Sequence, residues 1–156
     1  MGVKKPYYRT CRQFSGGSYS EGGRWAYIIH PKFAESPVHY IRAFLLLQDD
    51  LLKIFEFIEP AHKNRNVYSF RVHELLLRVC VEVEANCKAI LKENGYIKSG
   101  DWNMGDYKKI EASHRLSAFS VYLPVWNGAR NIRRPFAAWK TGGSLSWYSA
   151  YNLTKH

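Results

Sequence analysis

Apolar residues recur at steps of three and four positions between Ser69 and Asn94, a spacing that predicts one long amphipathic helix. Ser69 can cap the first turn of this helix, and Gly95 can end its last turn. On the polar side, Glu74 and Arg78 have the spacing of a favourable ion pair along one helix face. All of these signals indicate the same element. Its apolar positions are Val72, Leu76, Val79, Cys80, Val83, Cys87, Ile90 and Leu91.

A second helix is predicted from Ser36 to about Ile58. The Ser36 hydroxyl can cap the first turn, Pro37 suits the first helical position, and Pro60 prevents continuation. Apolar residues occupy more than one stripe of this helix, so we expect it to pack against more than one neighbour.

The remaining chain is less regular. We expect residues 1–35 to form an irregular, basic, flexible arm, because paired glycines interrupt this segment. A shorter helix is predicted from Asp106 to about Ser113, an extended segment over 116–123, and a last helix from near Ser144 to the end. No terminator follows this last helix, which predicts that it continues past His156 in a longer parent protein. The expected fold is mainly α: a compact helical bundle over residues 36–156 with one short extended segment.

The net charge of +10 is distributed unevenly along the chain. Residues 1–32 hold six basic residues against one acid, and residues 112–156 hold six basic residues and no acid. Aromatic residues are interleaved with both basic groups, a pattern typical of proteins that bind a phosphate backbone. Alternatively, the positive charge serves only to keep protein molecules from associating, and the aromatic rings belong to the hydrophobic core. The basic residues near the C-terminus are Arg115, Arg130, Arg133, Arg134, Lys140 and Lys155.

Several classes of protein are disfavoured by what the sequence lacks. The longest uncharged apolar run, 43–47, is far shorter than the roughly 20 residues of a membrane helix, and no secretory signal is present. We therefore expect a cytoplasmic protein without a membrane partner. Cys80 and Cys87 should be about 10 Å apart along one helix, beyond disulfide reach. The chain also offers no cluster of zinc ligands, phosphate loop or dinucleotide fingerprint, so no metal and no cofactor are expected.

Glu84 lies on the border of the apolar face of the 69–94 helix, near Cys80, Cys87 and Leu91 at about 100° per residue. A carboxylate in this position is partly desolvated and needs a cationic or hydrogen-bonding partner. Two interpretations remain open, a buried polar tie to another helix and a role in a site.

Three parts of the chain carry a family resemblance: the segment 68–71, the helix 74–91 and the ending 147–156, within a similarity that begins at about Val38. Together they resemble uncharacterised bacterial proteins related to the HEPN superfamily. Members of this superfamily are helical bundles, and many are metal-independent RNases of toxin–antitoxin, phage-defence or RNA-processing systems. Others bind RNA without cleaving it. The resemblance implies an RNA partner, a homodimer, and an antitoxin or other protein partner.

The resemblance also places a catalytic site on the last helix. It aligns His156 with the superfamily's histidine and Asn152 beside it, and Glu84 is able to reach toward this helix. The arginine that the superfamily carries shortly before the histidine is absent from 149–152. Metal-free RNA cleavage needs a base near the 2′-hydroxyl and a cation near the phosphate. The cation would then come from Lys155, from Arg130, Arg133 or Arg134 in the preceding loop, or from a second subunit. The predicted nucleic-acid-binding residues are Arg130, Arg133, Arg134, Lys140 and Lys155.

The sequence therefore predicts a HEPN-like RNA-binding domain, acting as a metal-independent endoribonuclease or as a non-catalytic binder. The alternative is a non-catalytic protein-interaction or structural module in which the rings are core and the charge is dispersed. A small-molecule enzyme ranks third, because no nucleophile motif supports it.

Overall fold

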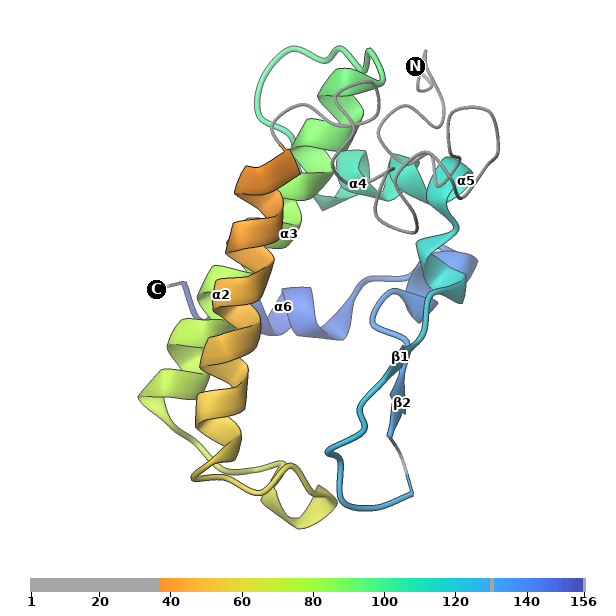
Figure 1. Cartoon of the computed structure of the whole chain (residues 1–156). Coiled ribbons are helices and arrows are strands. Elements are labelled where there is room, and N and C mark those ends of the chain that lie inside the picture. Colours follow the sequence, from red (N-terminus) through yellow and green to blue (C-terminus); the bar gives the residue numbers. More distant parts are fainter. Residues whose placement is uncertain (1–36, 130, 156) are drawn as a thin grey trace, which may run out of the picture. The chain divides into compact units, whose positions relative to one another are not determined.

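The computed structural model describes residues 37–129 and 131–155, and the predicted basic arm of residues 1–35 lies outside them, as does the Ser36 cap. The chain forms two compact units. Of the described residues, the first combines 37–44 with 84–114, and the second combines 45–83 with 115–129 and 131–155. Helices dominate the described residues and the only sheet among them has two short strands, which confirms the mainly α prediction (Figure 1).

The long helix predicted in the middle of the chain is α3, Phe70–Glu93. The Ser69 hydroxyl accepts a hydrogen bond from the Arg71 N–H at 3.2 Å, which is the expected N-terminal cap. At the other end Gly95 has a φ of 74°. The N–H groups of Gly95 and Tyr96 donate to the Lys92 and Leu91 carbonyls, so the helix ends in a Schellman motif. The prediction for this helix is confirmed at both ends.

The preceding helix, α2, spans Pro37–Phe55 and ends three residues before the predicted boundary at Ile58. The chain then turns through η4, His62–Asn64, before α3 begins. Several apolar side chains of α2 are at least half exposed rather than packed against several neighbours as predicted. They are Val38, Phe44, Leu45, Leu46 and Leu52, with exposed fractions of 50–71%.

In the first unit a short helical run follows α3. It consists of α4 (Met104–Tyr107), η5 (Lys108–Ile110) and α5 (Glu111–His114), where a helix from Asp106 to Ser113 was predicted. Asn103 starts the run two residues early through a capping box with Asp106. The core of this unit contains three almost fully buried side chains, Leu91, Tyr107 and Ile110.

Asp106 is a charged residue of the first unit that is only 4% exposed. Its carboxylate accepts hydrogen bonds from the Tyr96 hydroxyl at 2.7 Å, the Lys98 amine at 2.8 Å and the Asn103 N–H at 2.9 Å. The bond from Lys98, followed by those from Tyr96 and Asn103, holds the pKa of Asp106 well below its usual range. The charged carboxylate therefore joins the end of α3 to the start of α4.

The second unit contains the remaining elements of the chain. The segment 116–123, predicted to be extended, starts with the 3-10 turn η6 (Leu116–Ala118). Its backbone is extended at Phe119, and it pairs as a strand at β1 (Val121–Tyr122). Strand β1 pairs antiparallel with β2 (Ile132–Arg133), with Val121 opposite Arg133. The 3-10 helix η7 (Ala137–Thr141) and the helix α6 (Ser146–Leu153) follow. Helix α6 begins two residues later than predicted and ends at Leu153 rather than at the end of the chain.

The described helices show no segment both long enough and apolar enough to cross a lipid bilayer. Cys80 and Cys87 are both buried on α3, and they form no disulfide with each other. Cys11 lies outside the described residues.

Candidate nucleic-acid interface

The loop between β1 and β2 in the second unit folds back onto the connection between α2 and α3. The Leu123 N–H donates to the Asn131 carbonyl at 2.8 Å and closes the base of the loop. The Asn127 N–H donates to the Pro60 carbonyl, also at 2.8 Å, and Trp126 lies edge-on to the ring of His62 at 5.5 Å. These contacts fix the position of the Trp126 ring relative to both segments.

Arg133 lies over the ring of Trp126. The centre of its guanidinium is 4.5 Å from the ring centroid, within the range of a cation–π interaction. Because Arg133 is on β2 and Trp126 is in the preceding loop, the hairpin itself brings the two residues together. Such stacking limits the rotamers of the arginine and lowers the entropy that it loses when it contacts a phosphate.

A continuous series of aromatic rings runs from the end of the hairpin to α6. We call Phe136, Trp139, Trp147, Tyr148 and Tyr151 the aromatic ladder. Phe136 lies 5.0 Å from Trp139 and 5.8 Å from Trp147, and Trp147 lies 5.9 Å from Tyr148. Tyr148 is 5.4 Å from Tyr151. The indole N–H of Trp147 donates to the Pro135 carbonyl at 2.8 Å, which ties α6 to the segment after β2.

A second cation lies at the far end of the ladder. The Lys155 amine is 3.9 Å from the centroid of Tyr151 and 5.9 Å from that of Tyr148. Lys155 and the nearby Asn152 are both exposed, whereas Tyr151 beneath them is buried. One end of the aromatic ladder therefore contacts the Lys155 amine, and its other end, Phe136, lies close in sequence to Arg133 and Arg134.

The predicted nucleic-acid-binding residues fall largely in one unit. Arg133, Arg134, Lys140 and Lys155 all belong to the second unit, and Arg134 and Lys140 are exposed. Arg130 lies outside the described residues. No acidic residue occurs anywhere between positions 115 and 156, whereas six basic residues do.

The predicted catalytic residues are divided between parts of the chain. Asn152 is an exposed residue of α6 in the second unit, and His156 lies outside the described residues. Glu84 is a half-buried residue of α3 in the first unit. The grouping of these three residues into one site stays a prediction.

In the first unit, Glu84 influences two buried groups that can ionise. Burial, and then the negative charge of Glu84, raise the pKa of the Cys87 thiol to about 12. Burial and Glu84, in the same order, raise the pKa of Tyr107 to about 12. Both groups are neutral at physiological pH, so the Cys87 thiol is not a ready nucleophile.

Comparison with known proteins gives no relative: no family model, curated protein or solved structure matches this chain.

Sequence reasoning found the basic residues and the rings but not their pairing. Tyr151 and Lys155 have a spacing of four, a signal that was available in the sequence. The pairing of Arg133 with Trp126 depends on the hairpin register, and the bond from Trp147 to Pro135 depends on tertiary packing. Neither of these contacts has a local sequence signal.

Proposed function

We propose that this protein is a HEPN-like RNA-binding domain that contacts single-stranded RNA through its second unit. The observation that carries the proposal is the acid-free segment 115–156, in which Arg133 and Lys155 are each held over an aromatic ring. Cations bind the phosphate backbone by releasing condensed counterions, a gain that does not depend on base sequence. Cations already held in place by rings contact the backbone at a lower cost in entropy.

Exposed rings favour a single strand over a duplex. Tyr122 on β1 is 61% exposed and Phe119 is 44% exposed, so each has surface on which an unpaired base can stack. In an A-form duplex the bases are already stacked on one another, which leaves these rings without a partner.

Binding is tested by fluorescence anisotropy with a labelled, unstructured RNA in EDTA. Exchanging Arg133 and Lys155 together for alanine should weaken binding about tenfold at low salt. It should also lower the slope of log K against log salt by about 1.4, since each lost phosphate contact on a single strand contributes about 0.7.

The matched control exchanges Lys88 and Lys92 for alanine. Both are exposed on α3 in the first unit, and the change in net charge is the same. Equal weakening by the control pair would mean that net charge, rather than the second unit, attracts RNA. Absence of any binding at low salt would contradict the proposal as a whole.

The same RNA tests for metal-independent endoribonuclease activity. If the domain cleaves RNA, His156→Ala should abolish cleavage in EDTA, because His156 is the proposed base, and should leave binding close to that of the unmodified protein. Cleavage that survives the exchange would remove His156 from this role. If the unmodified protein binds this RNA but does not cleave it, the protein is a non-catalytic RNA binder.

One observation favours a second function, that of a protein-interaction module. The apolar side chains of α2, among them Phe44, Leu45 and Leu46, are more than half exposed. Large exposed apolar patches often mark contact surfaces for other proteins. This function ranks second because it leaves the acid-free basic segment without a role.

A further inference from the structure

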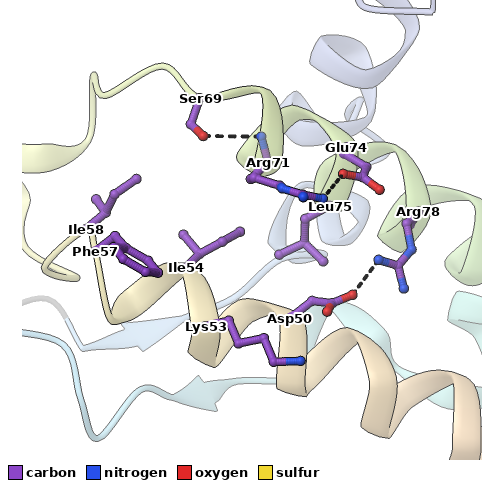
Figure 2. Close-up of a pocket in the computed structure, with 10 residues that line it drawn as sticks. All are labelled: Asp50, Lys53, Ile54, Phe57, Ile58, Ser69, Arg71, Glu74, Leu75 and Arg78. Carbon is purple, nitrogen blue, oxygen red and sulfur yellow. Dashed lines mark hydrogen bonds and ion pairs between the residues drawn. The ribbon is translucent and has the colours of Figure 1, made fainter.

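A cavity of about 500 Å³ lies in the second unit, between the C-terminal half of α2 and the beginning of α3 (Figure 2). Its size falls in the range of about 300–1,000 Å³ that is typical of small-molecule sites. None of the residues assigned above to RNA binding lines it. The lining residues are Asp50, Lys53, Ile54, Phe57, Ile58, Ser69, Arg71, Glu74, Leu75 and Arg78.

The cavity has an apolar end and a charged end. Figure 2 shows Phe57, Ile58 and Ile54 toward one side, and the head groups of Glu74 and Arg78 toward the other. Leu75, which is 9% exposed, projects between the two helices. Phe57 is 87% exposed, an unusual state for a phenylalanine and one that a ligand in the cavity would relieve.

The charged end carries three cations, Lys53, Arg71 and Arg78, and Lys53 forms an ion pair with Asp49 at 2.6 Å, outside the lining. Arg78 pairs with Asp50, and Arg71 pairs with Glu74 at 3.1 Å. Each of these ion pairs uses one nitrogen of the guanidinium, Nη1. A guanidinium has five N–H donors, so an arginine can keep its carboxylate partner and also bind an anionic ligand.

We propose that this cavity binds a small amphipathic organic anion, with its apolar body on Phe57, Ile54 and Ile58 and its carboxylate or phosphate head beside Arg71 and Arg78. The shared chemistry of the head is a group of negatively charged oxygens, which suits the remaining N–H donors of the two guanidinium groups. This site is separate from the proposed RNA contacts, so either proposal can fail without the other.

The proposal is tested by methyl NMR with octanoate and octyl phosphate, each below the concentration at which it forms micelles. Both should produce saturable shifts of the Ile54 and Ile58 methyl groups, while Ile132, which does not line the cavity, stays unchanged. Octanol and octylammonium carry the same chain with a neutral and a cationic head, and each should bind at least fivefold more weakly than octanoate. A stronger response to one anion identifies the preferred head group.

Two variants test the two ends of the cavity separately. Phe57→Ala should weaken octanoate binding about tenfold through lost apolar contact, with Phe119→Ala as a control outside the cavity. Arg71→Gln, at a side chain that is 81% exposed, should weaken octanoate about fivefold and leave octanol unchanged. The proposal is overturned if octylammonium binds as tightly as octanoate, if Phe57→Ala has no effect, or if Ile132 shifts together with Ile54.

Discussion

Replacing Asp106 with asparagine should lower the free energy of unfolding by about 2–4 kcal/mol at pH 7, measured by urea denaturation. Asparagine has nearly the same shape but carries no charge, and it offers only one acceptor oxygen to the donors around it. The Lys98 amine and the Tyr96 hydroxyl would then compete for that oxygen in a site where position 106 is 4% exposed. A donor left unpaired in such a site is costly.

The effect should depend on pH in a defined direction. Because folding lowers the pKa of Asp106, the carboxylate contributes its full stability above the ordinary aspartate pKa of about 3.9 and loses it as the pH falls further. The difference in stability between Asp106→Asn and the unmodified protein should therefore shrink as the pH falls from about 4 to about 2. Asp101→Asn, at an exposed position of the same turn, is the control and should change stability by less than about 0.5 kcal/mol. A difference for Asp106→Asn that stays constant with pH would contradict the role of the charge.

Replacing Trp139 with alanine should destabilise the protein by about 3–5 kcal/mol, the usual cost of deleting a buried tryptophan side chain. Trp139 is 3% exposed and lies against Phe136 at the start of the aromatic ladder. Its loss leaves a cavity beneath the segment that carries Arg134 and Lys140. RNA binding should fall together with the folded fraction.

Hydrogen exchange followed by mass spectrometry can locate this effect. Protection should decrease first within 115–153, because that segment contains the ladder. Tyr122→Ala, which removes a ring that is 61% exposed, should leave the urea midpoint nearly unchanged. If Trp139→Ala kept the stability of the unmodified protein, the ladder would not be part of the core.

Elements with strong local signals were predicted correctly from the sequence. Helix α3 has apolar periodicity, a serine cap and a terminal glycine, and each of these acts within a few residues. The start of α4 was misplaced because Asn103 and Asp106 form a capping box with aspartate where glutamate or glutamine is usual.

The segment after α5 illustrates a different difficulty. Arg115 has a φ of 49°, a left-handed conformation that residues other than glycine rarely adopt. It directs the chain into the 3-10 turn η6, which packs against η7. Alternating apolar residues in this segment indicated a strand, but tertiary contact with η7 decided its conformation.

The candidate interface could be predicted only as a composition of basic and aromatic residues. Which ring supports which cation depends on the hairpin and on the bond from Trp147 to Pro135. The cavity between α2 and α3 was not predicted, because its residues come from two helices and appear in the sequence as ordinary amphipathic patterns.

The two buried thiols of α3 provide separate chemical reporters for the two units. Cys80 belongs to the second unit and is 0% exposed, whereas Cys87 belongs to the first and is 5% exposed. Alkylating reagents react with the thiolate of an accessible cysteine, so each side chain is modified only when its own part of the chain opens. Cleavage after Glu82 or Glu84 places the two cysteines on different peptides. The rates of modification then report the opening of each half of one continuous helix, without any introduced label.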